Sequence, residues 1–136
     1  MNYFFTSDLH FGHFNIIKYC NRPFSSIEEM NEVLISNYNS VVSTKDTTYI
    51  LGDFSMKCDY QTIHSLMNRL NGYKVFILGN HDNENHFIKM RDNKIIKSLH
   101  QTLGESIYSK YIWMSHYAHR VWNRSNKGSW HIYGHS

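Results

Sequence analysis

KVFILGNHD, residues 74–82, joins an apolar run to a short polar one. Its first five residues are rich in β-branched and aromatic side chains and are followed by a glycine, a pattern typical of a buried β-strand. An amide, an imidazole and a carboxylate follow at once in Asn80, His81 and Asp82. Open α/β sheets bind their ligands at the carboxyl ends of the strands. The stretch therefore predicts a strand that carries polar side chains to a ligand site.

Two earlier stretches have the same arrangement. Residues 2–6 and 47–51 are short apolar runs that predict strands. Asp8 and His10 follow the first run, and Asp53 follows the second. Three strands that each end in metal-binding residue types indicate one polar site, assembled at a common edge of the sheet.

Helical patterns separate these strands. Ser26 and Glu29 form a capping box that opens a helix, and residues 60–70 repeat apolar side chains at helical spacing. A shorter helix is predicted over residues 14–19. The apolar stripe of the helix that Ser26 opens consists of Ile27, Met30, Leu34, Tyr38 and Val41. The alternation of strands and helices predicts an α/β fold with a parallel sheet and right-handed connections.

The second half of the chain has a less regular pattern. Residues 84–90 favour a helix, whereas residues 95–107 are ambiguous and suggest two short strands around Gly104. Two further strands are predicted, each followed by a histidine: residues 111–114 before His116, and residues 130–133 before His135.

The composition is that of a globular protein. Its 136 residues, 41% of them hydrophobic, suit one domain over residues 1–136. No apolar run approaches the roughly 20 residues of a membrane helix, and the first residues lack the pattern of a secretory signal. Cys20 and Cys58, far apart in the chain, then indicate a reduced, cytoplasmic protein. The formal charge of +3 would tolerate an anionic substrate but does not by itself predict a nucleic-acid surface.

The side chains at the predicted strand ends form a mixed set of oxygen and nitrogen ligands. Such a set suits Mn, Fe, Zn or Ni, and the lack of cysteine argues against a closed structural zinc site. The predicted metal ligands are Asp8, His10, Asp53, Asn80, His116 and His135. Asp8 and His10 can hold one ion, and Asp53 can bridge to a second. Because two neighbouring ions stabilise displacement at phosphorus, we expect two divalent metal ions, with Mn favoured, and a phosphate-ester substrate.

Two residues are predicted to be catalytic. His81 is expected to donate a hydrogen bond to a phosphoryl or leaving-group oxygen. Asp82 is expected to orient the ring of His81 and to raise its pKa.

Other side chains are candidates for substrate binding. Arg120 and His13 are the main ones, and His119 and Arg124 share the same features, since arginine binds phosphate in bidentate fashion. A solvent-exposed loop position without a role is an equal alternative for these residues.

Five short stretches, in order along the chain, resemble the motifs of the calcineurin-like metallophosphoesterases. They are Asp8-Leu9-His10, Gly52-Asp53, Gly79-Asn80-His81-Asp82, His116 and Gly134-His135. Residues 8–17 and 22–24 look like a small bacterial and phage branch of predicted phosphoesterases. The resemblance implies a metallophosphoesterase-type α/β sandwich, with the metal site at the carboxyl ends of its strands. It also implies these roles: Asp8 and His10 on the first metal, Asp53 bridging, Asn80, His116 and His135 on the second, and His81 as the catalytic histidine.

The last of these motifs departs from the family pattern. In the family it reads Gly-His-x-His, and its final histidine binds the first metal, whereas this chain ends at Ser136, one residue earlier. The resemblance also implies further strands that build a second sheet. We therefore expect a fragment or a shortened form, with its C-terminal strands missing and a weakly occupied first metal site.

Together these features predict a dinuclear phosphoesterase that hydrolyses a phosphomonoester or phosphodiester through a metal-bound hydroxide. Nucleotides, nucleic acids and phosphoproteins are all open as substrates, and so is the oligomeric state. One alternative is a metal-binding domain that is catalytically weak or silent and acts as an interaction module. Another is a module for single-stranded nucleic acid, which would stack bases on its ten tyrosines and three tryptophans.

Overall fold

A parallel sheet forms the centre of the molecule. The computed structural model describes residues 1–12, 14–56 and 58–135. Its first sheet has the order β1-β2-β3-β4, with β1 (Tyr3–Thr6), β2 (Thr47–Ile50), β3 (Tyr73–Ile77) and β4 (Ser98–His100). Each neighbouring pair is parallel, which confirms the expected α/β fold. The three strands predicted before residue 80 end within one residue of their expected limits.

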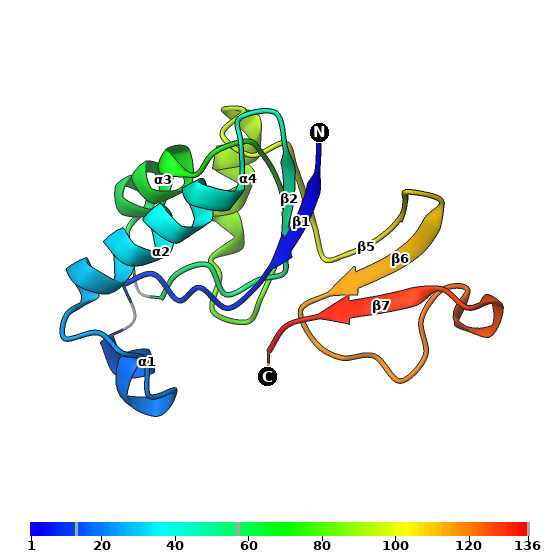
Figure 1. Ribbon diagram of the computed structural model, residues 1–136, viewed down its shortest axis with the longest axis horizontal. Helices are drawn as coiled ribbons and strands as arrows, with labels where there is room; N and C mark the ends of the chain where they lie inside the picture. The colour runs from blue at the N-terminus through cyan, green and yellow to red at the C-terminus, as the bar shows by residue number, and fades with distance from the viewer. Residues whose placement is uncertain (13, 57, 136) are drawn as a thin grey trace.

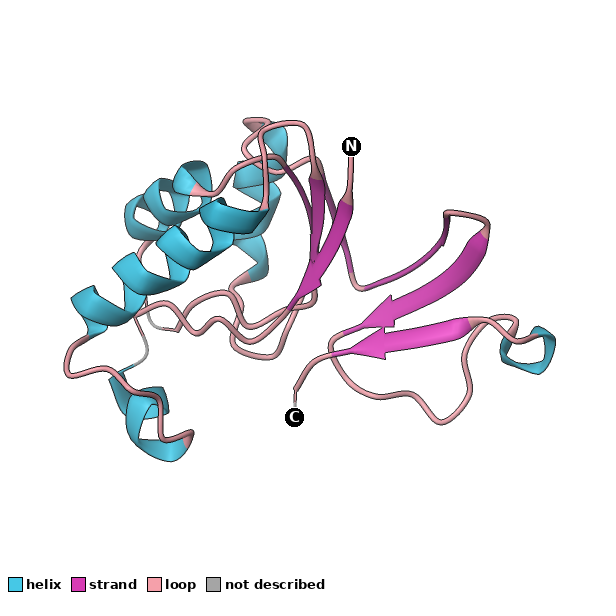
Figure 2. Ribbon diagram, in the orientation of Figure 1, coloured by secondary structure: helices cyan, strands magenta, loops and turns pink. Residues whose placement is uncertain are grey.

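Helices cover one face of this sheet. The chain forms α1 (Phe14–Tyr19), α2 (Ile27–Val41), α3 (Tyr60–Arg69) and α4 (Glu84–Asp92). Figure 1 shows α2, α3 and α4 together on one side of the strands, and Figure 2 shows the same helical layer in cyan. Their apolar sides pack with Ile50, Phe54 and Phe76 into one core. None of the described helices has the length and apolar character that crossing a bilayer requires.

The ends of α2 follow the predicted pattern with two differences. Ser26 Oγ accepts the N–H of Glu29 at 3.1 Å, as expected, but the Glu29 carboxylate accepts the N–H of Ser25, also at 3.1 Å. The predicted apolar stripe is wrong at its last position, because Val41 is 63% exposed whereas Val42 is buried. Val42 lies beyond the last helical turn in an extended conformation, which redirects its side chain to the core.

A second, mixed sheet covers the other face of the first. It consists of β5 (Thr102–Ile107), β6 (Lys110–Ser115) and β7 (Trp130–Tyr133). β5 and β6 are antiparallel, whereas β6 and β7 are parallel. The apolar side chains between the two sheets form a core of their own, which includes Val75 and Met114. Residues 102–133 thus build a second sheet of three strands, two of which match the strands predicted over residues 111–114 and 130–133.

Close packing explains why residues 95–107 give an ambiguous pattern. The break between β4 and β5 lies at Gln101 and not at Gly104, which pairs with Trp113 inside β5. A Cβ at position 104 would lie 2.0 Å from the Tyr111 hydroxyl. Gly104 is therefore a site of close side-chain approach within a strand, and not a turn residue.

The connections on either side of β6 lack the sequence patterns that usually mark turns. β5 turns into β6 through Tyr108 and Ser109, which both have positive φ, at 50° and 67°. A two-residue hairpin favours this backbone but is usually signalled by Asn or Gly. The long link from β6 to β7 contains the short 3₁₀ helix η1 (Ser125–Lys127) and brings β7 back parallel to β6.

Candidate metal centre

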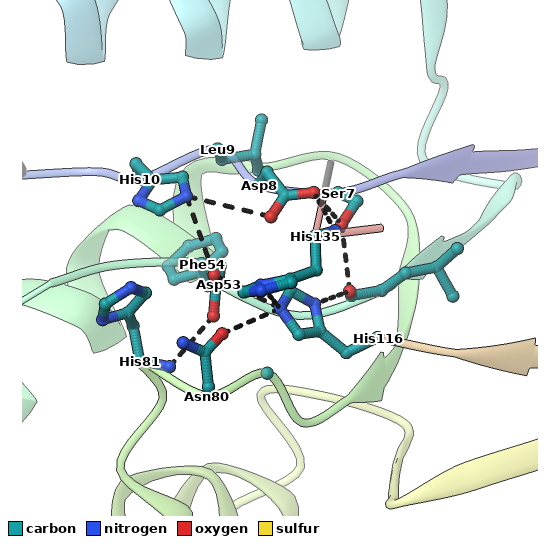
Figure 3. A network of polar contacts seen from close by, with 12 residues as sticks. Ser7, Asp8, Leu9, His10, Asp53, Phe54, Asn80, His81, His116 and His135 are labelled. Carbon is teal, nitrogen blue, oxygen red and sulfur yellow. Dashed lines mark hydrogen bonds and ion pairs between the residues drawn. The ribbon is translucent and has the colours of Figure 1, made fainter. Parts of the chain in front are cut away.

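The carboxyl ends of strands from both sheets meet at one place. Loops after β1, β2 and β3 of the first sheet and after β6 and β7 of the second converge there, as Figure 3 shows. The structure thus brings together all six predicted metal ligands: Asp8, His10, Asp53, Asn80, His116 and His135. The site lies between two sheets and not at the edge of one, because β6 and β7 belong to the second sheet.

The first cluster consists of Asp8, His10 and Asp53. Their ligand atoms lie within 4.8 Å of one another. His10 Nε2 is 3.8 Å from Asp8 Oδ1 and 3.7 Å from Asp53 Oδ2. These distances are longer than hydrogen bonds. They leave space for an ion that each atom would contact at about 2.1 Å.

The second cluster consists of Asp53, Asn80, His116 and His135. His116 Nε2 lies 3.0 Å from Asn80 Oδ1, 3.1 Å from His135 Nδ1 and 3.3 Å from Asp53 Oδ2. Asp53 Oδ2 also faces His10 of the first cluster. One buried carboxylate oxygen is therefore common to both clusters.

The contacts of His116 indicate that the second cluster suits a cation. His116 Nδ1 lies 2.7 Å from the carbonyl oxygen of Leu51, which can only accept a hydrogen bond. Nδ1 must therefore carry a proton, and in the neutral ring Nε2 presents a lone pair to the cluster. Facing lone pairs on His116 and the Asp53 carboxylate repel each other unless a proton or a cation lies between them. The mixed nitrogen and oxygen donors fit a borderline divalent metal.

The Asn80 amide can serve this cluster in two orientations. With its oxygen inward it faces acceptor atoms only, which suits a ligand of a cation. Rotated by 180°, its nitrogen would lie within donating distance of four acceptors: Asp53 Oδ1 and Oδ2 at 3.2 Å, His116 Nε2 at 3.0 Å and His135 Nδ1 at 3.2 Å. Without an ion, the two N–H groups of this amide can pair with two of these acceptors, and with an ion its oxygen adds a ligand.

Four of the six candidate ligands have a left-handed backbone conformation. The φ angles of Asp8, His10, Asp53 and His135 lie between 53° and 56°. This conformation costs an L-residue roughly 1–2 kcal/mol, although Asp and His adopt it more often than most residues. Strain of this kind concentrates at functional sites, where the surrounding fold maintains it.

Glycines allow the loops after β2 and β3 to touch. A Cβ on Gly79 would lie 2.4 Å from the backbone nitrogen of Asp53, and one on Gly52 would lie 2.5 Å from His116 Nδ1. Any larger residue at either position would separate these loops. The glycines that precede Asp53 and Asn80 are therefore required by the packing of the site.

The Asp82 carboxylate has backbone partners that the sequence did not predict. It accepts the backbone N–H groups of Asp53 and Gly79 at 2.8 Å and that of Phe54 at 3.0 Å. These bonds tie together the loops after β2 and β3, and the expected contact of Asp82 with the His81 ring stays a prediction. Burial raises the pKa of Asp82 to about 6, against the lowering effect of the three hydrogen bonds. Asp82 is thus a positioning residue for the loops that carry the clusters.

His81 lies at the exposed rim of the centre. Its backbone N–H donates to Asp53 Oδ1 at 3.0 Å, and its ring lies 5.7 Å from that of His10. The residue is exposed to solvent. This position allows contact with a substrate bound at the clusters.

Two residues that the sequence analysis did not assign to the site hold the loop after β1. Arg22 donates to the carbonyl oxygens of Asp8 and Leu9, both at 2.8 Å. Ser7 Oγ lies 2.6 Å from Asp8 Oδ2 and 2.9 Å from the carbonyl oxygen of Leu51. No local pattern signals these contacts, because they depend on where the chain places backbone oxygens.

The predicted substrate-binding residues have different positions. His13 lies outside the described residues, so its role stays a prediction. Arg120 is exposed in the loop after β6, and its role also stays a prediction. Arg124 lies at the opposite end of β6 from the clusters, 4.5 Å above the ring of Tyr111.

An open cleft adjoins the second cluster. Its volume is about 400 Å³. Asn80 and His116 line it, together with residues that lie outside the clusters: Leu78, Gly79, Asp82, Glu84, Gln101, Thr102, Ser115, Tyr117 and His119. Among the described side chains considered for substrate binding, His119 reaches this cleft.

Known proteins resemble this chain in sequence and in fold. The uncharacterized protein MJ1445 of Methanocaldococcus jannaschii is 57% identical over 77 residues, which make up 56% of this chain and 44% of that protein. The gene 66 protein of Mycobacterium phage L5 is 41% identical over 83 residues, 60% of this chain and 40% of that protein. The matched part is thus less than half of each relative.

A solved structure shares the fold. The crystal structure of AQ665, a protein of unknown function from Aquifex aeolicus, superimposes with a TM-score of 0.70 at 25% identity, covering 93% of this chain and 68% of that one. The profile of the calcineurin-like phosphoesterases matches residues 1–136. Metal-dependent hydrolysis of phosphoesters is the activity this family suggests, and the two Asp and His clusters are consistent with it. With a match over its whole length, the chain belongs to the calcineurin-like phosphoesterase family.

Proposed function

We propose that the protein is a dinuclear phosphoesterase that hydrolyses a phosphomonoester or phosphodiester at the joined clusters. The observation that carries this proposal is the position of Asp53. Its Oδ2 lies 3.7 Å from His10 Nε2 and 3.3 Å from His116 Nε2, so one buried carboxylate serves both clusters. A shared acid of this kind is what two ions a few ångströms apart require.

The protein supplies ligands and orientation to this centre. Asp8, His10 and Asp53 would hold one ion, and Asp53, Asn80, His116 and His135 the other. When bound, a pair of divalent ions, for which we propose Mn, activates water and neutralises phosphoryl charge. The Leu51 carbonyl keeps His116 in the tautomer whose Nε2 can bind metal.

His81 is the proposed catalytic residue. Its exposed ring beside the first cluster supports a role as hydrogen-bond donor to a phosphoryl or leaving-group oxygen. The bond from its backbone N–H to Asp53 Oδ1 keeps the residue next to the shared carboxylate. Arg120 and His13 are proposed as additional substrate contacts.

Turnover of p-nitrophenyl phosphate and bis(p-nitrophenyl) phosphate tests this function and separates monoesterase from diesterase activity. We expect hydrolysis that a chelator removes and Mn restores. His81→Ala should lower kcat by about 10²–10⁴-fold, as loss of a general acid does. His64→Ala, on α3 and outside both clusters, is the control and should retain full activity. Tight Mn binding without turnover of either ester would contradict the proposal and favour the silent interaction module.

A further inference from the structure

The cleft beside the second cluster has a chemistry of its own. Its volume of about 400 Å³ is in the range of small-molecule sites. Because Asn80 and His116 line it, the organic group of an ester whose phosphate lies at the second cluster would extend into it. The remaining lining residues therefore face the part of the substrate that is not phosphate.

One wall of the cleft is acidic. Glu84 is the exposed first residue of α4, and its Oε2 accepts a hydrogen bond from Gln101 Nε2 at 3.1 Å. Among the described residues that line the cleft, none is a lysine or an arginine. The other carboxylate, Asp82, already accepts three backbone N–H groups. A second phosphate in the cleft would thus be repelled by the carboxylate of Glu84, and no lysine or arginine of the described lining would offset this repulsion.

Neutral hydrogen-bonding groups also line the cleft. His119 Nδ1 accepts the indole N–H of Trp113 at 3.2 Å, so the proton of the neutral ring lies on Nε2. The backbone N–H of His119 donates to His131 Nε2 at 2.9 Å, which fixes the residue in place. His119 therefore offers an oriented N–H donor to a ligand in the cleft.

An exposed aromatic ring completes the lining. Tyr117 is 48% exposed and packs against His135, with ring centroids 4.5 Å apart. Its position next to a metal ligand leaves ring surface for a planar group of the substrate. Aromatic rings bind such groups by offset stacking.

Given the proposed phosphoesterase function, we propose that this cleft binds the uncharged nucleoside part of a nucleoside monophosphate, and that Glu84 excludes alcohols bearing a second phosphate. Glu84 accepts from the sugar hydroxyls, His119 donates to an oxygen or ring nitrogen, and Tyr117 stacks on the base. The substrate is therefore a mononucleotide and not a bisphosphate or a polyanion.

A matched pair of ligands tests this assignment. Adenosine 5′-monophosphate and adenosine 3′,5′-bisphosphate differ by one phosphate, and whichever phosphate of the second binds metal, the other must enter the cleft. With Mn-loaded His81→Ala protein, in which cleavage of the ligand is slowed, calorimetry should show tighter binding of the monophosphate. Glu84→Gln should improve binding of the bisphosphate by about fivefold, the effect of one exposed charge. The same substitution should leave the affinity for the monophosphate nearly unchanged.

Two further variants complete the test. Glu28→Gln, in the first turn of α2, removes a comparable charge outside the cleft and should change the affinity for neither ligand. His119→Ala should weaken binding of adenosine 5′-monophosphate by about fivefold, the effect of one hydrogen bond.

The outcomes separate this assignment from the proposed function. If p-nitrophenyl phosphate is hydrolysed but Glu84→Gln leaves the ratio of the two affinities unchanged, the cleft assignment fails alone. If ribose 5-phosphate binds as tightly as adenosine 5′-monophosphate, the base is not recognised and the nucleoside assignment is overturned. A third outcome is that the protein prefers the monophosphate and Glu84→Gln loses this preference, but no ester is cleaved. In that case the proposed function fails and the cleft assignment stands.

Discussion

The two clusters of the metal centre share Asp53 but hold their other ligands differently. In the second cluster, His116 is fixed by the Leu51 carbonyl, and its Nε2 lies within 3.3 Å of three other ligand atoms. In the first, His10 Nε2 lies 3.7 and 3.8 Å from the carboxylates of Asp53 and Asp8. This difference indicates that the ligands of the second cluster are held together by direct contacts before a cation arrives, whereas those of the first are spaced apart with room for one. Preorganised ligands bind more tightly, so the second cluster should fill first.

The origin of the ligands explains this difference. The first cluster comes from the loops after β1 and β2 of one sheet, whereas the second also uses loops after β3, β6 and β7. Its geometry therefore depends on the packing of the two sheets against each other. The described residues give the second cluster four ligands and the first only three.

Replacement of the shared carboxylate should have the largest effect. Asp53→Asn keeps the size of the side chain and an oxygen for the His81 N–H but removes the charge between the ions. We expect kcat to fall by at least about 100-fold and both ions to bind more weakly. Metal analysis and ester hydrolysis on the same preparation measure this effect. Loss of one ion with the other unaffected would show that Asp53 does not bridge.

Single-ligand variants should separate the clusters. His116→Ala should lower the affinity of the tighter Mn site by at least about 100-fold, since even outer contacts of metal ligands are worth 10–100-fold. His10→Ala should instead affect only the weaker site. Calorimetric titration with Mn gives both affinities. If both variants weaken the same Mn site, His10 and His116 do not belong to separate sites.

Removal of the Asp82 charge should affect both clusters through the fold. Asp82→Asn retains only one acceptor oxygen for three backbone N–H groups, so it should cost about 2–3 kcal/mol of unfolding free energy. Urea denaturation of the metal-free protein measures this. Asp92→Asn, at the exposed end of α4, is the control and should change stability by less than about 0.5 kcal/mol. Equal stabilities of the two variants would contradict the assigned positioning role.

The smallest effect is expected from the hydroxyl beside the first cluster. Ser7→Ala removes the group 2.6 Å from Asp8 Oδ2 and should weaken the first ion by about tenfold. The second ion should be nearly unaffected. A larger loss at the second cluster would mean that the link from Ser7 to the Leu51 carbonyl matters more than its contact with Asp8.

The part of the site carried by the first sheet could be predicted from the sequence. The runs that become β1, β2 and β3 are each followed by polar residues, and parallel strands place their carboxyl ends at one edge. This was enough to select Asp8, Asp53 and Asn80 as neighbours without knowledge of the helices between them.

The second sheet and the support of the site could not be predicted in the same way. The turn at Tyr108 and Ser109 lacks the residues that usually signal a hairpin, so the sheet carrying His116 and His135 was not recognised. The bonds of the Asp82 carboxylate to backbone N–H groups 28 and 29 residues away were also not predicted. Contacts of this kind depend on the packing of distant loops and leave no periodic signal.

The central claim is that both clusters bind metal and share Asp53. Crystals of the Mn-loaded protein, measured at the Mn absorption edge, test it most directly. We predict two anomalous peaks about 3.5–4 Å apart, one on each side of the Asp53 carboxylate, with the peak at His116 stronger when Mn is limiting. A single peak that Asp53 does not contact, or two peaks too far apart to share its carboxylate, would contradict the claim.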